Sequence, residues 1–375
     1  MTARPFNLVV GTYTENLNHL EGHAKGLMGL RYDEDGTLGE AELLAEGVPN
    51  ASWLVASRDG RFIYAISETK FYEGRPGGSA TALARDTVTG ELTLLNTVYS
   101  GGIEPTHGDL DPSGRFLLLS NYRSGSVAAF AIDPDGSLGT MVGFVQDEGS
   151  SIHPVRQTGP HAHQIAIDPV TGRVLVPDLG LDSLLFFDLS PDGGLTEDRS
   201  VRYTGAAGAG PRHVDFHPDG THLLLLNELD NTLTVLRREG DGVVATDIKT
   251  TLPDGYAGHA QASGVRVSAD GRWVFTGNRG GNSSASAEHP GPRGDVDAIS
   301  IFEFDPASET VSLRRVEPTG LEPRDFIISP DQRNLIVVHQ DVDELAVYRF
   351  DPEGPSLSAI SVSSLPNPAA LVLVG

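Results

Sequence analysis

The sequence predicts an all-β fold, a seven-bladed β-propeller with four antiparallel strands in each blade. Three observations lead to this fold class. A tight-turn motif recurs at a regular spacing, a strand signature recurs after the turns, and the two chain ends hold the strands of one further blade. The six turns are about 54 residues apart on average, which is near the length of a four-stranded propeller blade.

The turns are of the kind D-P-x-G or S-x-D-G, and each stands between an alternating strand and an apolar run. This pattern is typical of a β-hairpin, so each turn joins two antiparallel strands. In the sixth turn Gln332 takes the place of the glycine. The glycines of the other five are Gly60, Gly114, Gly172, Gly220 and Gly271.

The second unit illustrates the strand order that returns in each blade. Its inner strand is predicted at Pro105–Leu110, and the next three at Phe116–Asn121, Ser126–Ile132 and Met141–Val145. The signature of the third strand returns as SVAAFAID, SLLFFDLS, TLTVLRRE, ISIFEFDP and LAVYRFDP. Repetition of one strand order along the chain favours a ring of similar blades.

The two chain ends complete a seventh blade. Pro368–Val374 resembles a lone first strand, whereas Phe6–Tyr13, Leu27–Tyr32 and Ala41–Ala45 resemble the second, third and fourth. Pairing them leaves no open sheet edge. We therefore expect residues 1–375 to form a single propeller domain, with a polar Gly/Ser/Pro-rich insertion at 280–296 as its main irregularity.

Composition excludes several classes of function. The chain has no cysteine, so disulfides, thiolate metal sites and a cysteine nucleophile are excluded. Its formal net charge is -24, which repels nucleic acid and anionic membranes, so we expect neither as a partner. An anionic small molecule needs a local cluster of arginines to bind here. The apolar run before Gly11 is too short for a signal peptide or a membrane span, and we expect a cytoplasmic protein.

One hairpin, GPRHVDFHPDGTHLLLLNE at 210–228, brings a cation and a carboxylate together. Arg212 lies eight residues before Gly220, and Glu228 lies eight residues after it. Residues equally far from a hairpin turn finish at the same end, so the two side chains meet at one rim of the ring. A plain surface salt bridge is the structural alternative.

The same geometry gathers further polar residues at that rim, because first strands begin there and second strands end there. Two of these candidates are His163 and Arg324. The structural alternative to a functional role is a hydrogen-bonded histidine for His163 and a clamp between blades for Arg324. The other candidates are His107, Asn121, Arg212, Glu228 and Arg279.

These residue types suit the opening of a lactone by water. The reaction needs a base, a donor for the oxyanion and a proton for the ring oxygen. Glu228 or His163 could be base or acid, and Arg212 could stabilise the oxyanion. There is no G-x-S-x-G elbow and no phosphate loop, so water is the expected nucleophile. His161 and His163 share one strand face, but no further ligand completes a metal site, and we expect no metal and no cofactor.

Several motifs resemble one known family. They are VGTYT at 9–13, GPHAHQIAIDP at 159–169, GAGPRHVDFHPDG at 208–220, LNELDNTLTV at 226–235 and PRDFIISPD at 323–331. They are similar to the seven-bladed propeller lactonases, which include propeller-type 6-phosphogluconolactonases and fungal carboxymuconate lactonising enzymes. The resemblance implies a catalytic His163, Arg212 and Glu228, a substrate-binding Arg279 and no required metal.

The sequence thus predicts a hydrolase of an acidic sugar lactone, with 6-phospho-D-glucono-1,5-lactone as the expected substrate and a monomer or weak homo-oligomer as its state. Spacing alone leaves two alternatives open. One is a lactonising cycloisomerase that closes a carboxylated muconate, and the other is a propeller that binds a sugar acid without catalysis. Substrate binding is assigned to Arg279, Arg324, His107 and Asn121.

Overall fold

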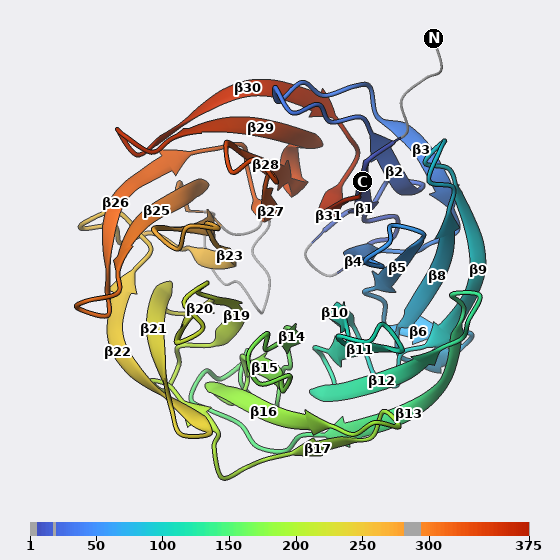
Figure 1. The fold of residues 1–375 in the computed structure, drawn as a ribbon, viewed down its shortest axis with the longest axis horizontal. Coiled ribbons are helices and arrows are strands. Elements are labelled where there is room, and N and C mark those ends of the chain that lie inside the picture. Colours follow the sequence, from blue (N-terminus) through green and yellow to red (C-terminus); the bar gives the residue numbers. More distant parts are fainter. Residues whose placement is uncertain (1–5, 18–19, 281–293, 375) are drawn as a thin grey trace.

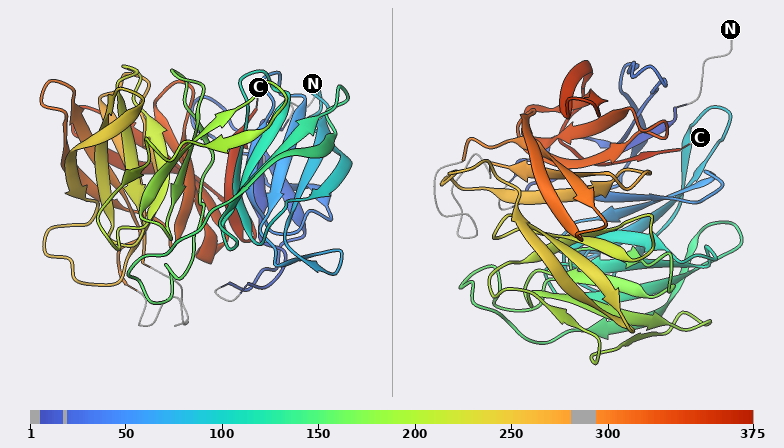
Figure 2. Two further views of the ribbon diagram at one scale, coloured as in Figure 1. Left: turned by 90° about the horizontal axis from the view of Figure 1, so that it is seen from below. Right: turned by 60° about the vertical axis from the view of Figure 1, so that its left-hand side comes forward.

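The computed structural model is a ring of seven β-sheets around a central channel (Figure 1). It describes residues 6–17, 20–280 and 294–374. Seen from the side, the sheets stand around the channel with loops at both faces of the ring (Figure 2). Among the described residues, no helix has the length and apolar character needed to cross a membrane. The prediction of a seven-bladed propeller is confirmed.

The strands are grouped here by their place in the blade. The inner strands are β4 (Ala51–Ala56), β10 (Pro105–Leu110), β14 (Ala166–Ile167), β19 (Pro211–Phe216), β23 (Gln261–Val267), β27 (Pro323–Ile328) and β31 (Pro368–Leu373). The second strands are β5 (Phe62–Ser67), β11 (Phe116–Asn121), β15 (Val174–Asp178), β20 (His222–Asn227), β24 (Trp273–Arg279), β28 (Asn334–His339) and β1 (Leu8–Thr12). The third strands are β8 (Ser79–Arg85), β12 (Ser126–Ile132), β16 (Ser183–Leu189), β21 (Thr232–Glu239), β25 (Ala298–Asp305), β29 (Glu344–Asp351) and β2 (Gly26–Leu30).

The outer strands are β9 (Leu92–Tyr99), β13 (Leu138–Gln146), β17 (Leu195–Glu197), β22 (Gly242–Thr250), β26 (Thr310–Pro318), β30 (Ser356–Ser364) and β3 (Glu42–Glu46). Two short elements lie outside this scheme. A small hairpin of β6 (Phe71–Tyr72) and β7 (Arg75–Pro76) extends from the first blade, and one turn of 3-10 helix, η1, follows β28 at Gln340–Val342.

The closing blade is built from both ends of the chain, as predicted. Its sheet order is β3-β2-β1-β31, so the strand nearest the C-terminus is the inner one. β1 and β31 are antiparallel, with Val9 opposite Val372. The pairing joins the two chain ends in one sheet and covers the inner edge of β1.

The six predicted turns adopt the same backbone conformation. Gly220 has a φ of 71°, in the left-handed region that favours glycine. Gln332, which replaces the glycine, has a φ of 62°. The sequence motif therefore marks an equivalent turn even where its glycine is missing.

Apolar side chains fill the space between neighbouring blades. Tyr64 and Ile66 of β5, for example, lie in one buried cluster with Leu117 and Leu119 of β11. Polar side chains on the inner strands add ties from blade to blade. Asp215 Oδ2 accepts a hydrogen bond from the backbone N–H of Val267 at 2.8 Å. The channel wall is thus rigidly connected, which fixes the positions of side chains at its rim.

The third blade departs from the predicted four regular strands. Its outer strand is split, because β17 and β18 (Tyr203–Thr204) both pair with β16. Its inner strand, β14, keeps only two residues in the ladder. The segment before β14 bonds to neighbouring blades instead: Ile165 N–H donates to His107 Nδ1 at 3.3 Å, and Gln164 Oε1 accepts from Val214 N–H at 2.6 Å.

Candidate active site

Arg212 sits on a β-bulge at the start of its strand. On β19 and β20, Pro211 faces Asn227 and His213 faces Leu226, so Arg212 is an extra residue without a partner in the ladder. Proline suits the first position because it has no N–H to give to the sheet. A bulge turns the extra side chain out of the regular alternation. The fold therefore uses the bulge to aim Arg212 out of its sheet.

The same bulge recurs at Arg324 in the sixth blade, where the register of β27 and β28 shifts between Pro323 and Asp325. Arg324 Nη2 donates to Glu68 Oε2 at 3.1 Å, and Tyr13 Oη donates to the same oxygen at 2.8 Å. Arg324 is therefore held between blades, as its structural alternative requires. Its charge also acts on the pKa of His163.

Arg212 joins the two other residues of the predicted catalytic set. Its Nη1 donates to Glu228 Oε2 at 2.6 Å and also contacts His163 Nε2. His163 Nε2 lies 3.9 Å from Glu228 Oε2. The Nε of Arg212 donates to the carbonyl of Ser263, which fixes the plane of the guanidinium group. The predicted meeting of Arg212 and Glu228 is confirmed, and His163 lies at the same place.

Three guanidinium groups surround the Glu228 carboxylate. Besides Arg212, Arg156 Nη2 donates to Oε1 at 2.6 Å, and Arg279 Nη2 lies 3.4 Å from Oε2. Glu228 is 2% exposed, and each of the three arginines is 7% exposed or less. A carboxylate held this way is a fixed negative charge that orients the arginines around it.

The buried cluster carries more positive than negative groups. Arg279 Nη1 lies 3.7 Å from Glu322 Oε1, which gives that arginine a second carboxylate. The cations of the cluster are Arg156, Arg212, Arg279 and Arg324. Its carboxylates are Glu68, Glu228 and Glu322. Among the described residues, four guanidinium groups thus face three carboxyl groups, which is the local arginine cluster that an anionic substrate requires in so acidic a protein.

The electrostatics set the protonation of His163 and Glu228. Burial, reinforced by Arg212, holds the pKa of His163 well below its ordinary value of 6.5. Burial alone would raise the pKa of Glu228, but Arg156 and Arg212 with Arg279 hold it well below the ordinary value. At neutral pH the imidazole is therefore neutral and the carboxylate is ionised.

Two further groups keep their ordinary charge at neutral pH despite burial. Burial, together with the neighbouring Arg279, lowers the pKa of Arg212 to about 10, so this guanidinium stays protonated. Burial raises the pKa of Tyr13 well above 10, so its hydroxyl stays neutral. The charge surplus of the cluster is unchanged by these shifts.

Two predicted substrate-binding residues lie apart from this hydrogen-bonded cluster. His107 stacks on Trp53 in the channel, with ring centroids 3.8 Å apart, and accepts a hydrogen bond from Ile165 N–H. Asn121 is fully buried, and its Nδ2 donates at 3.2 Å to the carbonyl of Ser100, in the connection from the preceding blade. Their predicted role in substrate binding stays a prediction. Most of the predicted insertion at 280–296 lies outside the described residues.

Sequence reasoning missed Glu68 and Tyr122, although a simple signal marks them. Each is the first residue after the second strand of its blade, and Glu228 and Tyr13 hold that position in theirs. In all four cases the backbone N–H of this residue bonds a carbonyl just before the inner strand, as Glu228 N–H does with Gly210 at 2.7 Å. A search for rim residues that includes the first residue after each second strand would have found all four of these side chains.

Arg156 was missed for a different reason. It lies in the long segment between β13 and β14, which has no strand periodicity, and no sequence rule relates that segment to the rim. Its Nη2 nevertheless bonds both Glu228 and, at 3.0 Å, the hydroxyl of Tyr122. Only the folded structure places it in the cluster.

One group of potential metal ligands occurs among the described residues, away from the cluster. His217, Asp219 and His222 lie around the turn of the β19–β20 hairpin, whereas Arg212 and Glu228 lie at its other end. The turn itself uses these side chains, since His222 Nδ1 contacts Asp219 Oδ2 at 2.7 Å. The prediction that catalysis requires no metal stays a prediction.

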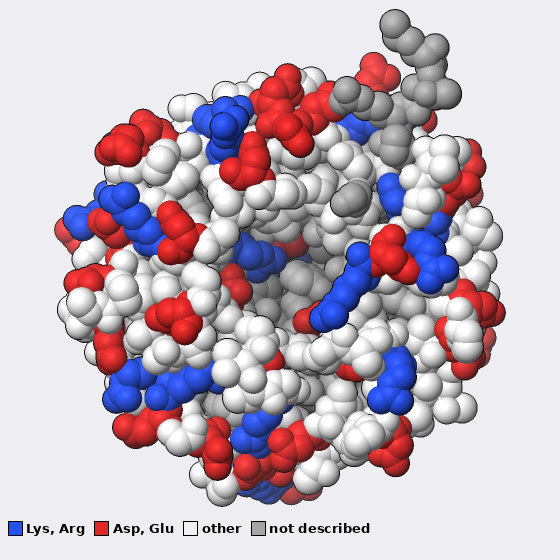
Figure 3. Space-filling model, in the orientation of Figure 1, with Lys and Arg blue, Asp and Glu red and all other residues white. Residues whose placement is uncertain are grey.

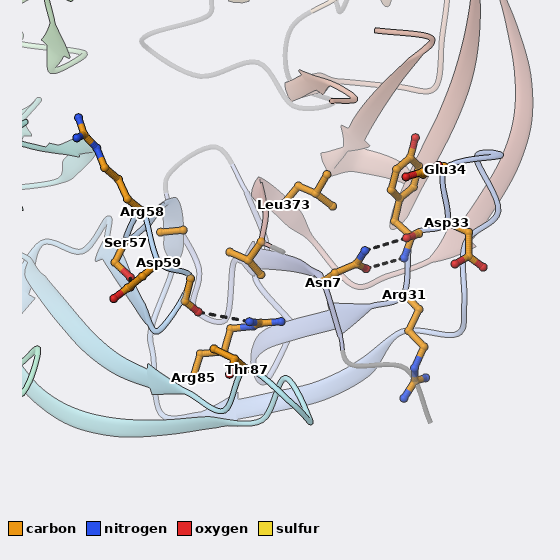
Figure 4. Close-up of a pocket in the computed structure, with 14 residues that line it drawn as sticks. Asn7, Arg31, Asp33, Glu34, Ser57, Arg58, Asp59, Arg85, Thr87 and Leu373 are labelled. Atoms are coloured by element: carbon orange, nitrogen blue, oxygen red, sulfur yellow. Dashed lines mark hydrogen bonds between the residues drawn. The ribbon is translucent and has the colours of Figure 1, made fainter. Parts of the chain in front are cut away.

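Cavities also occur elsewhere on the ring. One of about 830 Å³ lies between the closing blade and the first blade, with Asn7, Arg31, Asp59 and Arg85 in its wall (Figure 4). No residue of the predicted catalytic set lines it. The face in Figure 3 is hollowed at its centre, and both acidic and basic side chains surround the hollow.

Comparisons with known proteins agree on one family. A family model described as "Lactonase, 7-bladed beta-propeller" matches residues 7–373. A 6-phosphogluconolactonase of Bacillus subtilis is 31% identical over 367 residues, which covers 96% of each chain. A 6-phosphogluconolactonase of Formosa agariphila is 28% identical over 339 residues, which covers 88% of this chain and 90% of the relative.

A solved structure shows the same fold. The periplasmic gluconolactonase of Pseudomonas aeruginosa superimposes with a TM-score of 0.86 and 29% sequence identity. The match covers 99% of each chain. The likeness therefore extends around the whole ring.

Proposed function

Because the chain belongs to the seven-bladed β-propeller lactonase family, we propose that its site opens 6-phospho-D-glucono-1,5-lactone with water. Lactone hydrolysis is supported by the relatives named 6-phosphogluconolactonase. The observation that carries the assignment to this site is the contact of Arg212 with both His163 and Glu228 in one buried cluster.

In this mechanism His163 is the base. Arg212 Nη1 donates to His163 Nε2, so the imidazole proton belongs on Nδ1 and the lone pair on Nε2. When the lactone carbonyl oxygen accepts the hydrogen bond of that Arg212 N–H in its place, His163 Nε2 becomes available to a water molecule. The neutral imidazole then removes a proton as the water oxygen bonds to the carbonyl carbon.

Arg212 stabilises the negative charge that forms on the carbonyl oxygen. Its guanidinium is already fixed by Glu228 and Ser263, so little reorganisation accompanies the reaction. Glu228 stays ionised and positions the arginines, because its pKa lies well below the ordinary value. Proton transfer therefore falls to His163 alone.

The second half of the reaction breaks the bond between the carbonyl carbon and the ring oxygen. The His163 imidazolium gives its proton to the departing ring oxygen, which becomes a hydroxyl group. Water has then added across the ester bond, and the product is the open-chain acid. His163 returns to its neutral form without any external acid.

The test is turnover by the pure protein. The opening rates of 6-phospho-D-glucono-1,5-lactone and of D-glucono-1,5-lactone are measured against the spontaneous rate, with the closure of a carboxymuconate as a third arm. We expect the phosphorylated lactone to be opened fastest. A protein that opens neither lactone above background, or that closes the muconate instead, contradicts the proposal. We also propose that the protein acts in the cytoplasm, which fractionation of cells decides.

A further inference from the structure

Arg156 holds hydrogen-bond donors that nothing in the described part of the chain accepts. Its Nη2 uses its bonds on Glu228 and Tyr122, but Nε and Nη1 have no partner and are buried. These two nitrogens carry three of the five N–H groups of the guanidinium. Burial alone would lower the pKa of Arg156, but Tyr122 and Glu228 raise it above the ordinary value, so the group is charged. A buried charged group is costly when its donors have no hydrogen-bond acceptor, so we expect a bound ligand to supply the acceptor.

The backbone around Arg156 is firmly fixed, so these donors have a defined position. The neighbouring Gln157 is fully buried, and its Nε2 donates to Leu179 O at 2.8 Å and to Asp182 Oδ1 at 2.7 Å. Arg156 N–H donates to His153 Nδ1 at 3.0 Å. Asp182 also accepts from Gly210 N–H at 2.8 Å, two residues before the catalytic bulge. The fold therefore holds Arg156 in a fixed relation to Arg212.

The charge of the cluster indicates what the acceptor is. Among the described residues, four guanidinium groups face three carboxyl groups, which is a surplus of one positive group in a protein of net charge -24. Such a surplus attracts an anion, whereas a neutral sugar would leave it uncompensated. A phosphate monoester supplies both the charge and several acceptor oxygens.

Among the four arginines, Arg156 has the most nitrogens that are both buried and without a partner in the described part of the chain, namely Nε and Nη1. Arg279 has only Nε without a partner, because its other nitrogens face Glu228, Glu322 and the carbonyl of Ala262. Arg212 and Arg324 do not appear among the described side chains with buried unpartnered atoms. The structure thus separates the arginine assigned to the oxyanion from the arginine that holds most of the buried, unpartnered donors.

We propose that Arg156 binds the phosphate group of the substrate and thereby makes the site prefer a phosphorylated lactone over a neutral one. This inference rests on the proposed function, which it deepens by naming the substrate class. It assigns substrate preference to the segment between β13 and β14, and carbonyl chemistry to Arg212 and His163.

The experiment compares two lactones in three proteins. Arg156→Gln removes the charge but leaves Glu228 paired with Arg212 and Arg279, so the fold is retained. Arg238→Gln is the control, because it removes a half-buried arginine that pairs with Asp168 in another part of the ring. We expect kcat/KM for 6-phospho-D-glucono-1,5-lactone to fall roughly 10- to 100-fold in Arg156→Gln, mainly through KM, while the value for D-glucono-1,5-lactone falls by a clearly smaller factor. The control keeps the wild-type preference.

A second measurement does not depend on turnover. Inorganic phosphate should raise the Tm of the wild-type protein and of Arg238→Gln, but not that of Arg156→Gln, and Arg156→Lys should recover only part of the effect. If both lactones lose rate equally, or if phosphate stabilises Arg156→Gln as well as wild type, the inference is wrong. If the wild-type protein opens neither lactone, the proposed function fails, and the phosphate measurement alone decides whether Arg156 binds the anion.

Discussion

Arg212 Nη1 and Glu228 Oε2 lie 2.6 Å apart although sixteen residues separate them in the sequence, because the hairpin turn at Gly220 brings both strand ends to one rim. The contact is buried and is shared with His163. Replacement of Arg212 by Met removes the oxyanion donor while keeping much of the side-chain volume. We expect kcat to fall about 10²- to 10³-fold with the fold intact.

The rate of Arg212→Met is measured on the phosphorylated lactone after subtraction of the spontaneous rate, and folding is checked by circular dichroism. Arg238→Met is the matched control, because it also removes an arginine that pairs with a carboxylate, Asp168. Wild-type turnover in Arg212→Met, or an equal loss in the control, contradicts the assigned role.

Glu228→Gln should lower stability as well as activity. It leaves Arg156, Arg212 and Arg279 without the carboxylate that they share, and breaking such a buried set costs about 3–5 kcal/mol. We expect a lower Tm in thermal unfolding, and a larger gain from added sulfate than in the wild type, since the anion offsets the lost charge. An unchanged Tm would show that the carboxylate is not needed to hold the arginines.

The pH dependence of the reaction follows from His163. A base must be neutral, and burial with Arg212 holds the pKa of this imidazole well below 6.5, so protonation stops the reaction only at lower pH. We expect kcat/KM to stay level as the pH falls from about 8 to about 6.5 and to decline only below that range. In Arg212→Met the residual activity should decline at a higher pH, because one cause of the depressed pKa is gone. A decline centred at or above pH 6.5 in the wild type counts against His163 as the base.

Asp182→Ala should loosen the segment that presents Arg156. The carboxylate accepts hydrogen bonds from Ser151, Gln157, Gly208 and Gly210, and all four are lost together. We expect trypsin to cleave after Arg156 in the variant but not in the folded wild-type protein, with a loss of activity of at least about tenfold. Asp59→Ala, in an exposed turn of the first blade, is the control. Resistance to trypsin in Asp182→Ala would show that other contacts suffice.

The seam of the ring is tested by a disulfide between β1 and β31. Val9 lies opposite Val372, and the chain has no other cysteine, so Val9→Cys with Val372→Cys can form a single bond. We expect the oxidised double variant to have a higher Tm than its reduced form, because the bond prevents the ends from separating. If no disulfide forms under oxidising conditions, the pairing is wrong.

The fold was predictable because its signals are local. A turn and the alternating residues on either side of it define a hairpin, and the bounds predicted for the first three strands of the second blade are those of β10, β11 and β12. The third blade could not be predicted as well, because the residues before its inner strand bond to side chains of other blades, such as His107.

The candidate site was predictable where it depends on hairpin geometry. Counting from Gly220 places Arg212 beside Glu228, and His163 stands nine residues before Gly172, one position from the equivalent count. Arg156 could not be found this way. Its position depends on Gln157 and Asp182, whose partners are distant in sequence and are brought close only by the assembled ring.

The pairing of β1 with β31 has a consequence for synthesis. β31 follows every other strand of the ring in the sequence, so it is the last of them to leave the ribosome and the ring closes only after all the others have emerged. Until then β1 has an exposed edge, and an unpaired edge of this kind invites association with other nascent chains. The closing blade is therefore the point at which we expect this protein to depend on molecular chaperones during its production.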